Sequence, residues 1–113
     1  MPFDPESCRF RVSAAADAVR SLGAQVDAIV AAGRAVRAAL DAGGMVLSFG
    51  NGGSAAQALH LAEELIGKYR ATRPPKRAIC LNADPTALTC IANDFGFGEV
   101  FARQVRGLAR PGD

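Results

Sequence analysis

The sequence lacks a strong excess of either charge, a long hydrophobic run and any pair of cysteines spaced like a metal site. Its 13 basic and 11 acidic residues give a net charge of +2, which is too even for a nucleic-acid-binding surface. No stretch approaches the roughly 20 apolar residues of a membrane span, and we expect no signal peptide. Cys8, Cys80 and Cys90 show no CxxC spacing, which indicates free thiols in a reducing compartment. We therefore expect a cytoplasmic protein with no nucleic-acid or membrane partner.

The most informative stretch is the glycine-rich segment Gly50-Asn-Gly-Gly-Ser54. It follows an apolar run, residues 45–49, and leads into a helical pattern from Ala55 to Ile66. A strand, a glycine-rich turn and a helix start together favour phosphate binding, because the backbone can approach the anion and the helix dipole points at it. The segment is neither a Walker loop nor a dinucleotide fingerprint, so an ordinary connecting loop is the alternative. Ser54 and Gln57 have the spacing of a capping box, and the Ser54 hydroxyl is well placed to donate to a phosphate.

The helix after this segment carries the only histidine, His60, and a glutamate at Glu64. These two residues share one helix face. They lie about 9 and 15 Å along the axis from Ser54, a span comparable to an extended sugar phosphate of about 10 Å. Spacing alone does not separate Glu63 from Glu64, and a surface role is the alternative for all three side chains. A His/Glu pair at this spacing also supplies two ligands of a zinc site, which needs two more from elsewhere.

Hydrophobic periodicity predicts an α/β fold in a single domain, residues 1–113, in which residues 1–43 form N-terminal helices and residues 44–113 begin the sheet. The expected helices span 4–23, 25–42, 55–66, 86–92 and 98–108, and the expected strands span 45–49 and 78–81. The strands should be parallel, because a helix connects them. The first helix has little to pack against in so small a domain, so we expect another subunit to cover it, with a frayed helix as the alternative.

Two further segments are candidates for binding. Asn93 and Asp94 follow the expected helix 86–92, where a structural turn is a real alternative to a ligand site. The basic, proline-punctuated loop 68–77 reads by default as a solvated connector, although Lys68 or Arg70 could hold an anionic substrate.

Four separate stretches, in the same order and with matching spacing, resemble the phosphoheptose isomerase group of the sugar isomerase (SIS) domain family. They are Gly50–Ser54, His60-x-x-Glu63-Glu64-Leu65, Asn93–Phe97 and Phe101–Val105. The resemblance runs from about residue 40 to the end and more loosely over residues 5–42. It implies an SIS-type, flavodoxin-like parallel sheet flanked by helices, with two N-terminal helices. It also implies that the chain corresponds to the N-terminal part of the fold, without the second half, which in the family has a serine-rich phosphate loop and a further metal-binding histidine.

The resemblance implies an aldose–ketose isomerase that converts sedoheptulose 7-phosphate to D-glycero-D-manno-heptose 7-phosphate for lipopolysaccharide or a related surface glycan. Glu64 is implied as the general base, and His60 and Glu64 as ligands of one Zn²⁺ per site. The implied substrate-binding residues are Asn51, Gly52, Gly53, Ser54, Glu64, Asn93 and Asp94. A homo-oligomer, as a tetramer with sites at subunit interfaces, is implied as well.

Two other functions stay open at this point. One is a non-catalytic SIS module that binds a sugar phosphate or a protein partner of the replication-initiator type. The other is a half-domain that assembles with a complementary chain, because an isolated two-stranded sheet leaves edges and apolar faces exposed.

Overall fold

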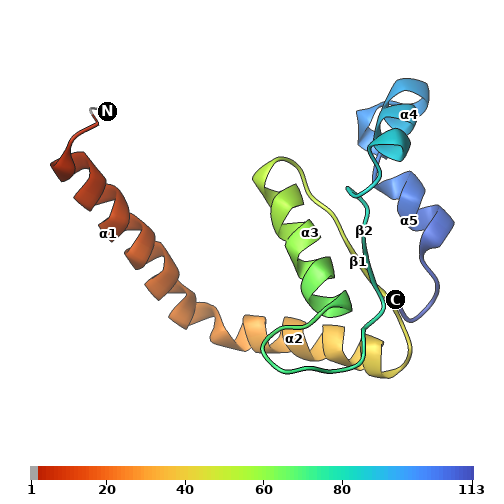
Figure 1. Cartoon of the computed structure of the whole chain (residues 1–113), viewed down its shortest axis with the longest axis horizontal. Helices are drawn as coiled ribbons and strands as arrows, with labels where there is room; N and C mark the ends of the chain where they lie inside the picture. The colour runs from red at the N-terminus through yellow and green to blue at the C-terminus, as the bar shows by residue number, and fades with distance from the viewer. Residues whose placement is uncertain (1–2) are drawn as a thin grey trace. The chain divides into compact units, whose positions relative to one another are not determined.

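The computed structural model describes residues 3–113. Its elements, shown in Figure 1, are α1 (Pro5–Ser21), η1 (Leu22–Gln25), α2 (Val26–Asp41), β1 (Val46–Ser48), α3 (Gly53–Ile66), β2 (Ala78–Cys80), α4 (Pro85–Phe95), η2 (Phe97–Glu99) and α5 (Ala102–Leu108). The chain divides into two compact units, Met1–Ala35 and Val36–Asp113. In the part of the chain that is described, no helix is both long and apolar enough to cross a membrane.

The first unit consists of helices whose side chains are mostly exposed. Asp4 caps α1 as a short polar residue should, because its Oδ1 accepts from the backbone N–H of Ser7 at 2.9 Å. Pro5 then occupies the start of the helix, where its missing N–H costs nothing. No residue of α1 is buried. The expected break near Gly23 takes the form of η1, so both N-terminal helices end close to their predicted bounds.

The second unit is built around two parallel strands. β1 and β2 pair from Val46 opposite Ala78 to Ser48 opposite Cys80. The crossover between them runs through α3, which confirms the predicted parallel connection. Figure 1 shows α3 on one side of the strands and α5 on the other, so helices flank this small sheet. The predicted α/β class is therefore confirmed.

The core between α3 and the sheet is made of small side chains. Ala58 and Ala62 of α3 pack with Cys80 of β2 and with Ala78 beside it. Small residues let the helix backbone approach the strands closely. Ser48, which is only 9% exposed, donates its hydroxyl to the carbonyl of Ala58 at 2.8 Å. This bond satisfies the one buried polar side chain of the described residues and fixes α3 against the end of β1.

The other side of the sheet is covered by the C-terminal helices. Leu81 and Val100 are almost fully buried there, at 1% and 2% exposure. The Gln104 amide donates to the carbonyls of both residues, at 3.0 and 2.9 Å. Phe49 and Phe101 stack with their ring centroids 4.8 Å apart. These contacts hold α5 against the residues that follow each strand.

Helix α4 is longer than predicted. Asp84 caps it, accepting from the N–H groups of Thr86 and Ala87, and the helix continues to Phe95 instead of ending near residue 92. Gly96, with φ of +89°, ends the helix as a glycine in the left-handed region can. The interpretation of Asn93 and Asp94 as part of a connecting turn is therefore wrong, because both lie in the last turn of α4.

Candidate functional site

The carboxyl ends of the two strands form the edge at which a ligand site is expected. β1 ends at Ser48 and β2 ends at Cys80, and because the strands are parallel, the segments that follow them leave from the same edge. In open α/β sheets, ligands bind outside the carboxyl ends of the strands. Residues 49–52 join this edge to the N-terminus of α3, where unpaired N–H groups and the helix dipole favour an anion.

The glycine-rich loop, Gly50–Ser54, has a backbone that requires glycine at two positions. Gly52 has φ of +56°, a region that side chains with a Cβ disfavour. At Gly50 a Cβ would lie 2.7 Å from the backbone carbon of Ser54 and 2.8 Å from its oxygen, closer than any side chain tolerates. The turn is closed by the N–H of Ser54, which donates to the carbonyl of Asn51 at 3.0 Å. All the loop residues from Asn51 to Ser54 are exposed.

Ser54 does not cap α3. The structure places Gly52 at the N-cap with no side-chain capping bond, so the predicted capping box with Gln57 does not form. The physical reason is the positive φ of Gly52, which lets its carbonyl accept from the N–H of Ala55 at 3.0 Å and starts the helix at Gly53 instead of Ala55. Ser54 therefore sits within the first turn, and its exposed hydroxyl is not committed to the helix.

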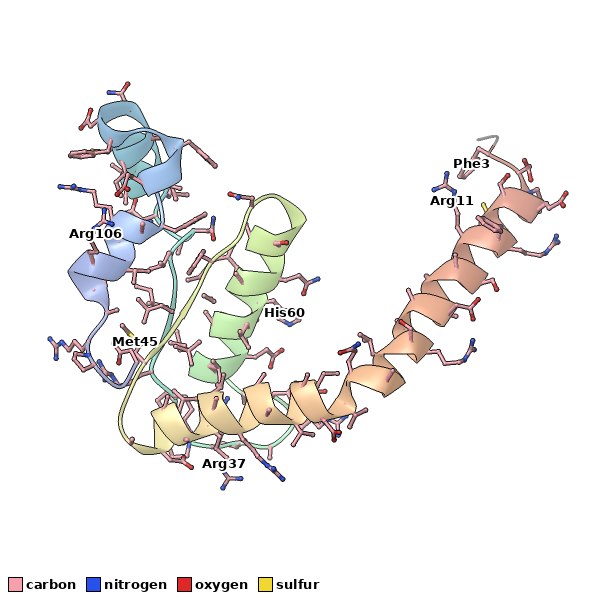
Figure 2. All side chains as sticks on the ribbon, turned by 180° about the vertical axis from the view of Figure 1, so that it is seen from behind. Phe3, Arg11, Arg37, Met45, His60 and Arg106 are labelled. Atoms are coloured by element: carbon pink, nitrogen blue, oxygen red, sulfur yellow. The ribbon has the colours of Figure 1, made fainter. Side chains whose placement is uncertain are left out.

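His60 and Glu64 meet on α3 as their spacing predicts. His60 Nε2 lies 3.1 Å from Glu64 Oε1, and the two side chains are 63% and 31% exposed. Figure 2 shows His60 projecting from α3 on the side away from the strands. Glu63 is exposed and Glu64 half-buried. The geometry thus separates the two glutamates, which spacing alone left equivalent: Glu64 is the one paired with the histidine.

The second carboxylate oxygen of Glu64 is an unpaired acceptor. Although part of the side chain is exposed, Oε2 itself is buried and has no hydrogen-bond partner among the described residues. A buried carboxylate oxygen without a donor is costly, so such an atom calls for a ligand, a proton or a cation. Oε2 thus lies next to a histidine on the helix that begins at the glycine-rich loop, with its acceptor capacity free within residues 3–113.

His60 and Glu64 fit two positions of a metal site. Zinc bonds of about 2.0–2.2 Å in tetrahedral geometry place neighbouring ligand atoms about 3.3–3.6 Å apart, so this pair needs only a small separation to hold the ion. The observed distance between His60 Nε2 and Glu64 Oε1 is 3.1 Å. No group of three or more His, Cys, Asp or Glu side chains gathers anywhere in residues 3–113. A complete tetrahedral set would therefore need ligands beyond these two.

Asn93 and Asp94 form a separate polar cluster on α4. Asn93 Nδ2 donates to Asp94 Oδ1 at 2.9 Å, and the Cys90 thiol donates to Asp94 Oδ2 at 3.5 Å. The hydrogen bond to Asp94, together with its negative charge, raises the pKa of the Cys90 thiol. Within residues 3–113 these bonds stay on one helix, so they do not link Asn93 or Asp94 with the glycine-rich loop or with Glu64.

Two residues that contact the site were not singled out from the sequence. Arg73, in the basic loop, donates through Nη2 to the carbonyl of Glu64 at 2.6 Å and through Nη1 to that of Leu65 at 2.8 Å, and so caps the C-terminus of α3. Asn82, just after β2, bonds to the backbone of Gly50 in both directions. A polar residue directly after a predicted parallel strand was the only signal for Asn82, and Arg73 had none.

Comparison with known proteins identifies several relatives. The SIS domain family model matches residues 11–113. The chain is 58% identical over 81 residues to the phosphoheptose isomerase of Streptomyces coelicolor, an overlap of 72% of this chain and 35% of that protein. It is 40% identical over 108 residues to the phosphoheptose isomerase of Akkermansia muciniphila, an overlap of 96% of this chain and 57% of that protein.

Solved structures give the same result. A phosphoheptose isomerase structure from Francisella tularensis superposes with a TM-score of 0.84 at 32% identity, over 96% of this chain and 56% of that one. One from Neisseria gonorrhoeae gives a TM-score of 0.69 at 38% identity, over 92% of this chain and 57% of that one. The chain thus spans about half the length of most of these relatives.

Proposed function

Because the chain belongs to the SIS domain family, we propose that it works in a phosphoheptose isomerase that converts sedoheptulose 7-phosphate to D-glycero-D-manno-heptose 7-phosphate, a precursor of lipopolysaccharide or a related surface glycan. The observation that carries the proposal is the buried, unpaired Oε2 of Glu64 beside His60. The relatives from Streptomyces coelicolor and Akkermansia muciniphila bear the name phosphoheptose isomerase, which supports the choice of reaction.

In this proposal, α3 connects the two ends of the substrate. The phosphate lies at the glycine-rich loop, where Asn51, Gly52, Gly53 and Ser54 contact it through exposed backbone and the Ser54 hydroxyl. Glu64 lies about 15 Å further along the helix axis, at 1.5 Å per residue, and the sugar phosphate, about 10 Å long when extended, runs along α3 toward it. Asn93 and Asp94 are proposed to bind sugar hydroxyls, with Asn93 already orienting the Asp94 carboxylate.

The reaction moves a proton between two neighbouring carbons through an enediol. Glu64 takes the proton on Oε2, because that oxygen has no competing donor among the described residues. His60 Nε2 lies 3.1 Å from Oε1 and orients the carboxylate directly, or would do so as a fellow ligand when a metal ion is bound. A second group must transfer the proton between the oxygens. Zn²⁺ held by His60 and Glu64 would polarise the sugar carbonyl when bound.

The test is a pair of neighbouring isosteric substitutions. Glu64→Gln removes the base and a metal ligand, and we expect it to lower kcat by at least about 100-fold. Glu63→Gln changes the charge identically on an exposed side chain and should keep activity within about twofold. Both variants are made in the protein expressed from its natural reading frame, and conversion of sedoheptulose 7-phosphate is followed together with zinc content. Equal activity of the two variants would refute the role of Glu64.

The same test separates isomerisation from a binding role. A non-catalytic module would bind the sugar phosphate but show no turnover in the unmodified protein, and Glu64→Gln would leave its binding intact. Loss of zinc in His60→Ala and Glu64→Gln, but not in Glu63→Gln, is the result expected if His60 and Glu64 are metal ligands.

We also propose a homo-oligomer, as a tetramer, in the cytoplasm. The support for assembly is the large apolar surface of the first unit, where Phe10, Val12, Val19 and Leu22 are all at least half exposed. The support for a reducing compartment is that Cys8, Cys80 and Cys90 are all free. Sedimentation velocity should show a single species of four chains. A monomer would refute the assembly.

A further inference from the structure

Asn82 makes two hydrogen bonds to a single backbone residue of the glycine-rich loop. Its Oδ1 accepts from the N–H of Gly50 at 3.0 Å, and its Nδ2 donates to the carbonyl of Gly50 at 2.9 Å. Asn82 lies just beyond the end of β2 and is half-buried, and the Cys80 thiol points at the same Oδ1 from 3.8 Å. The side-chain amide therefore occupies the donor and the acceptor of Gly50 together.

We propose that Asn82 is a positioning residue that sets the shape of the glycine-rich loop for the sugar phosphate, an inference that rests on the proposed function of that loop. Backbone pairing between the strands stops at the N–H of Leu81, which donates to the carbonyl of Ser48 at 2.8 Å. Beyond that bond the amide of Asn82 takes the place of a further strand residue. The side chain of Asn82 thus continues the hydrogen bonding between the two strands as far as Gly50, the first residue of the loop.

Fixing the backbone of Gly50 also restricts the first turn of α3. Gly50 has no side chain, and a Cβ would lie only 2.8 Å from the Cβ of Ser54, so the backbones of Gly50 and Ser54 are in close contact. Fixing both polar groups of Gly50 therefore fixes the start of α3 against it. Ser54 and the helix N-terminus are the proposed phosphate ligands, and neither has any contact of its own with β2 that the structure shows as a hydrogen bond.

The chemistry of this contact selects asparagine. The carboxamide carries one acceptor and one donor group in a plane, which matches the N–H and carbonyl of one residue. Aspartate has the same shape but would turn a second acceptor toward the Gly50 carbonyl, and would add a negative charge beside an anion site. Alanine would leave both groups of Gly50 without partners, at a cost typical of lost buried hydrogen bonds.

The expected kinetic result is a change in substrate affinity. Asn82 touches the loop that holds the phosphate and has no bond to Glu64, so Asn82→Ala should raise KM by about tenfold, with kcat within about threefold. Gln104→Ala is the matched control, because Gln104 is also a half-buried amide that bonds a backbone carbonyl after β2, that of Leu81, without reaching the loop. It should lower stability and leave KM unchanged.

The direct readout is amide hydrogen exchange at Gly50, measured by NMR on the ¹⁵N-labelled chain. Gly50 belongs to no helix or strand, yet its N–H should be protected in the unmodified chain. Protection should be lost in Asn82→Ala and kept in Gln104→Ala. Should the alanine variant not fold, Asn82→Asp provides the test: its retained acceptor should keep part of the Gly50 protection.

The outcomes separate this inference from the proposed function. An unprotected Gly50 amide in the unmodified chain, or equal KM values for Asn82→Ala and the unmodified enzyme, would overturn the positioning role. Loss of Gly50 amide protection in Asn82→Ala, together with a raised KM of that variant, supports the positioning role. If the unmodified protein does not convert sedoheptulose 7-phosphate, the proposed function fails, and the exchange measurement still decides whether Asn82 holds the loop.

Discussion

Replacing Gly50 with alanine should destabilise the second unit without changing any charge or hydrogen-bonding group. The added Cβ would lie 2.7 Å from the backbone carbon of Ser54 and 2.8 Å from its oxygen. These are backbone atoms of the first turn of α3, and Ser54 is bonded to Asn51, so they cannot rotate away as a side chain would. Overpacking of this kind costs about 1–3 kcal/mol, and we expect Gly50→Ala to lower the free energy of unfolding by that amount.

Urea unfolding followed by circular dichroism measures this effect. The free energy of unfolding falls by about 1–3 kcal/mol per molar urea, so a destabilisation of about 2 kcal/mol lowers the urea midpoint of unfolding by about 1 M. Gly53→Ala is the control three positions along the same loop, since a Cβ there has nothing within 4 Å and the residue is already helical. It should leave the midpoint unchanged or raise it slightly. If Gly50→Ala unfolds at the same urea concentration as the unmodified chain, the loop does not have the close approach described here.

Two more predictions concern the ends of elements. Arg73→Ala should lower the free energy of unfolding by about 1–3 kcal/mol, because the carbonyls of Glu64 and Leu65 lose a charged donor. Arg73→Lys should recover part of that stability. Equal urea midpoints for the unmodified chain and both variants would contradict the prediction. Hydrogen bonds from the backbone N–H groups of Arg110 and Met45 lower the pKa of Asp113 below its ordinary value of 3.8. The resulting stabilisation is complete above pH 3.8 and disappears as the pH falls through the lowered value, so Asp113→Ala should lose stability at neutral pH and match the unmodified chain in strong acid. A constant difference across that pH range in unfolding experiments would refute the assignment.

The elements of the fold were largely predictable because they depend on local pattern. Apolar periodicity predicted both strands and the helices around them, and the observed β1 and β2 fall inside the predicted strands. The start of α3 was predicted too late, at Ala55 instead of Gly53. A serine three positions before a glutamine is a good capping signal, but the positive φ of Gly52 decided where the helix begins, and dihedral choice at a glycine leaves no mark on the sequence.

In the candidate site, too, contacts set by local spacing were predictable and contacts set by the folded chain were not. The His60–Glu64 contact follows from helical spacing and was predicted, whereas the choice between Glu63 and Glu64 depends on which side of α3 is covered. The contacts of Asn82 and Arg73 were not predictable. Asn82 bonds to a residue 32 positions away, and Arg73 reaches a carbonyl nine positions back across an irregular loop. Neither separation corresponds to a helical or strand period, so only the folded chain brings these groups together.

The unpaired oxygen of Glu64 also bears on how the site is completed. A buried acceptor without a donor persists in a native structure only where something else supplies its partner. His60 occupies the other oxygen, and the residues described here gather no third metal-ligating side chain around the pair. Zinc in a protein takes four ligands, of which a catalytic site leaves one for substrate or water. The proposed zinc site therefore requires at least one ligand besides His60 and Glu64. A second copy of the chain could supply it, which would link the proposed isomerase activity to the proposed assembly through the same carboxylate.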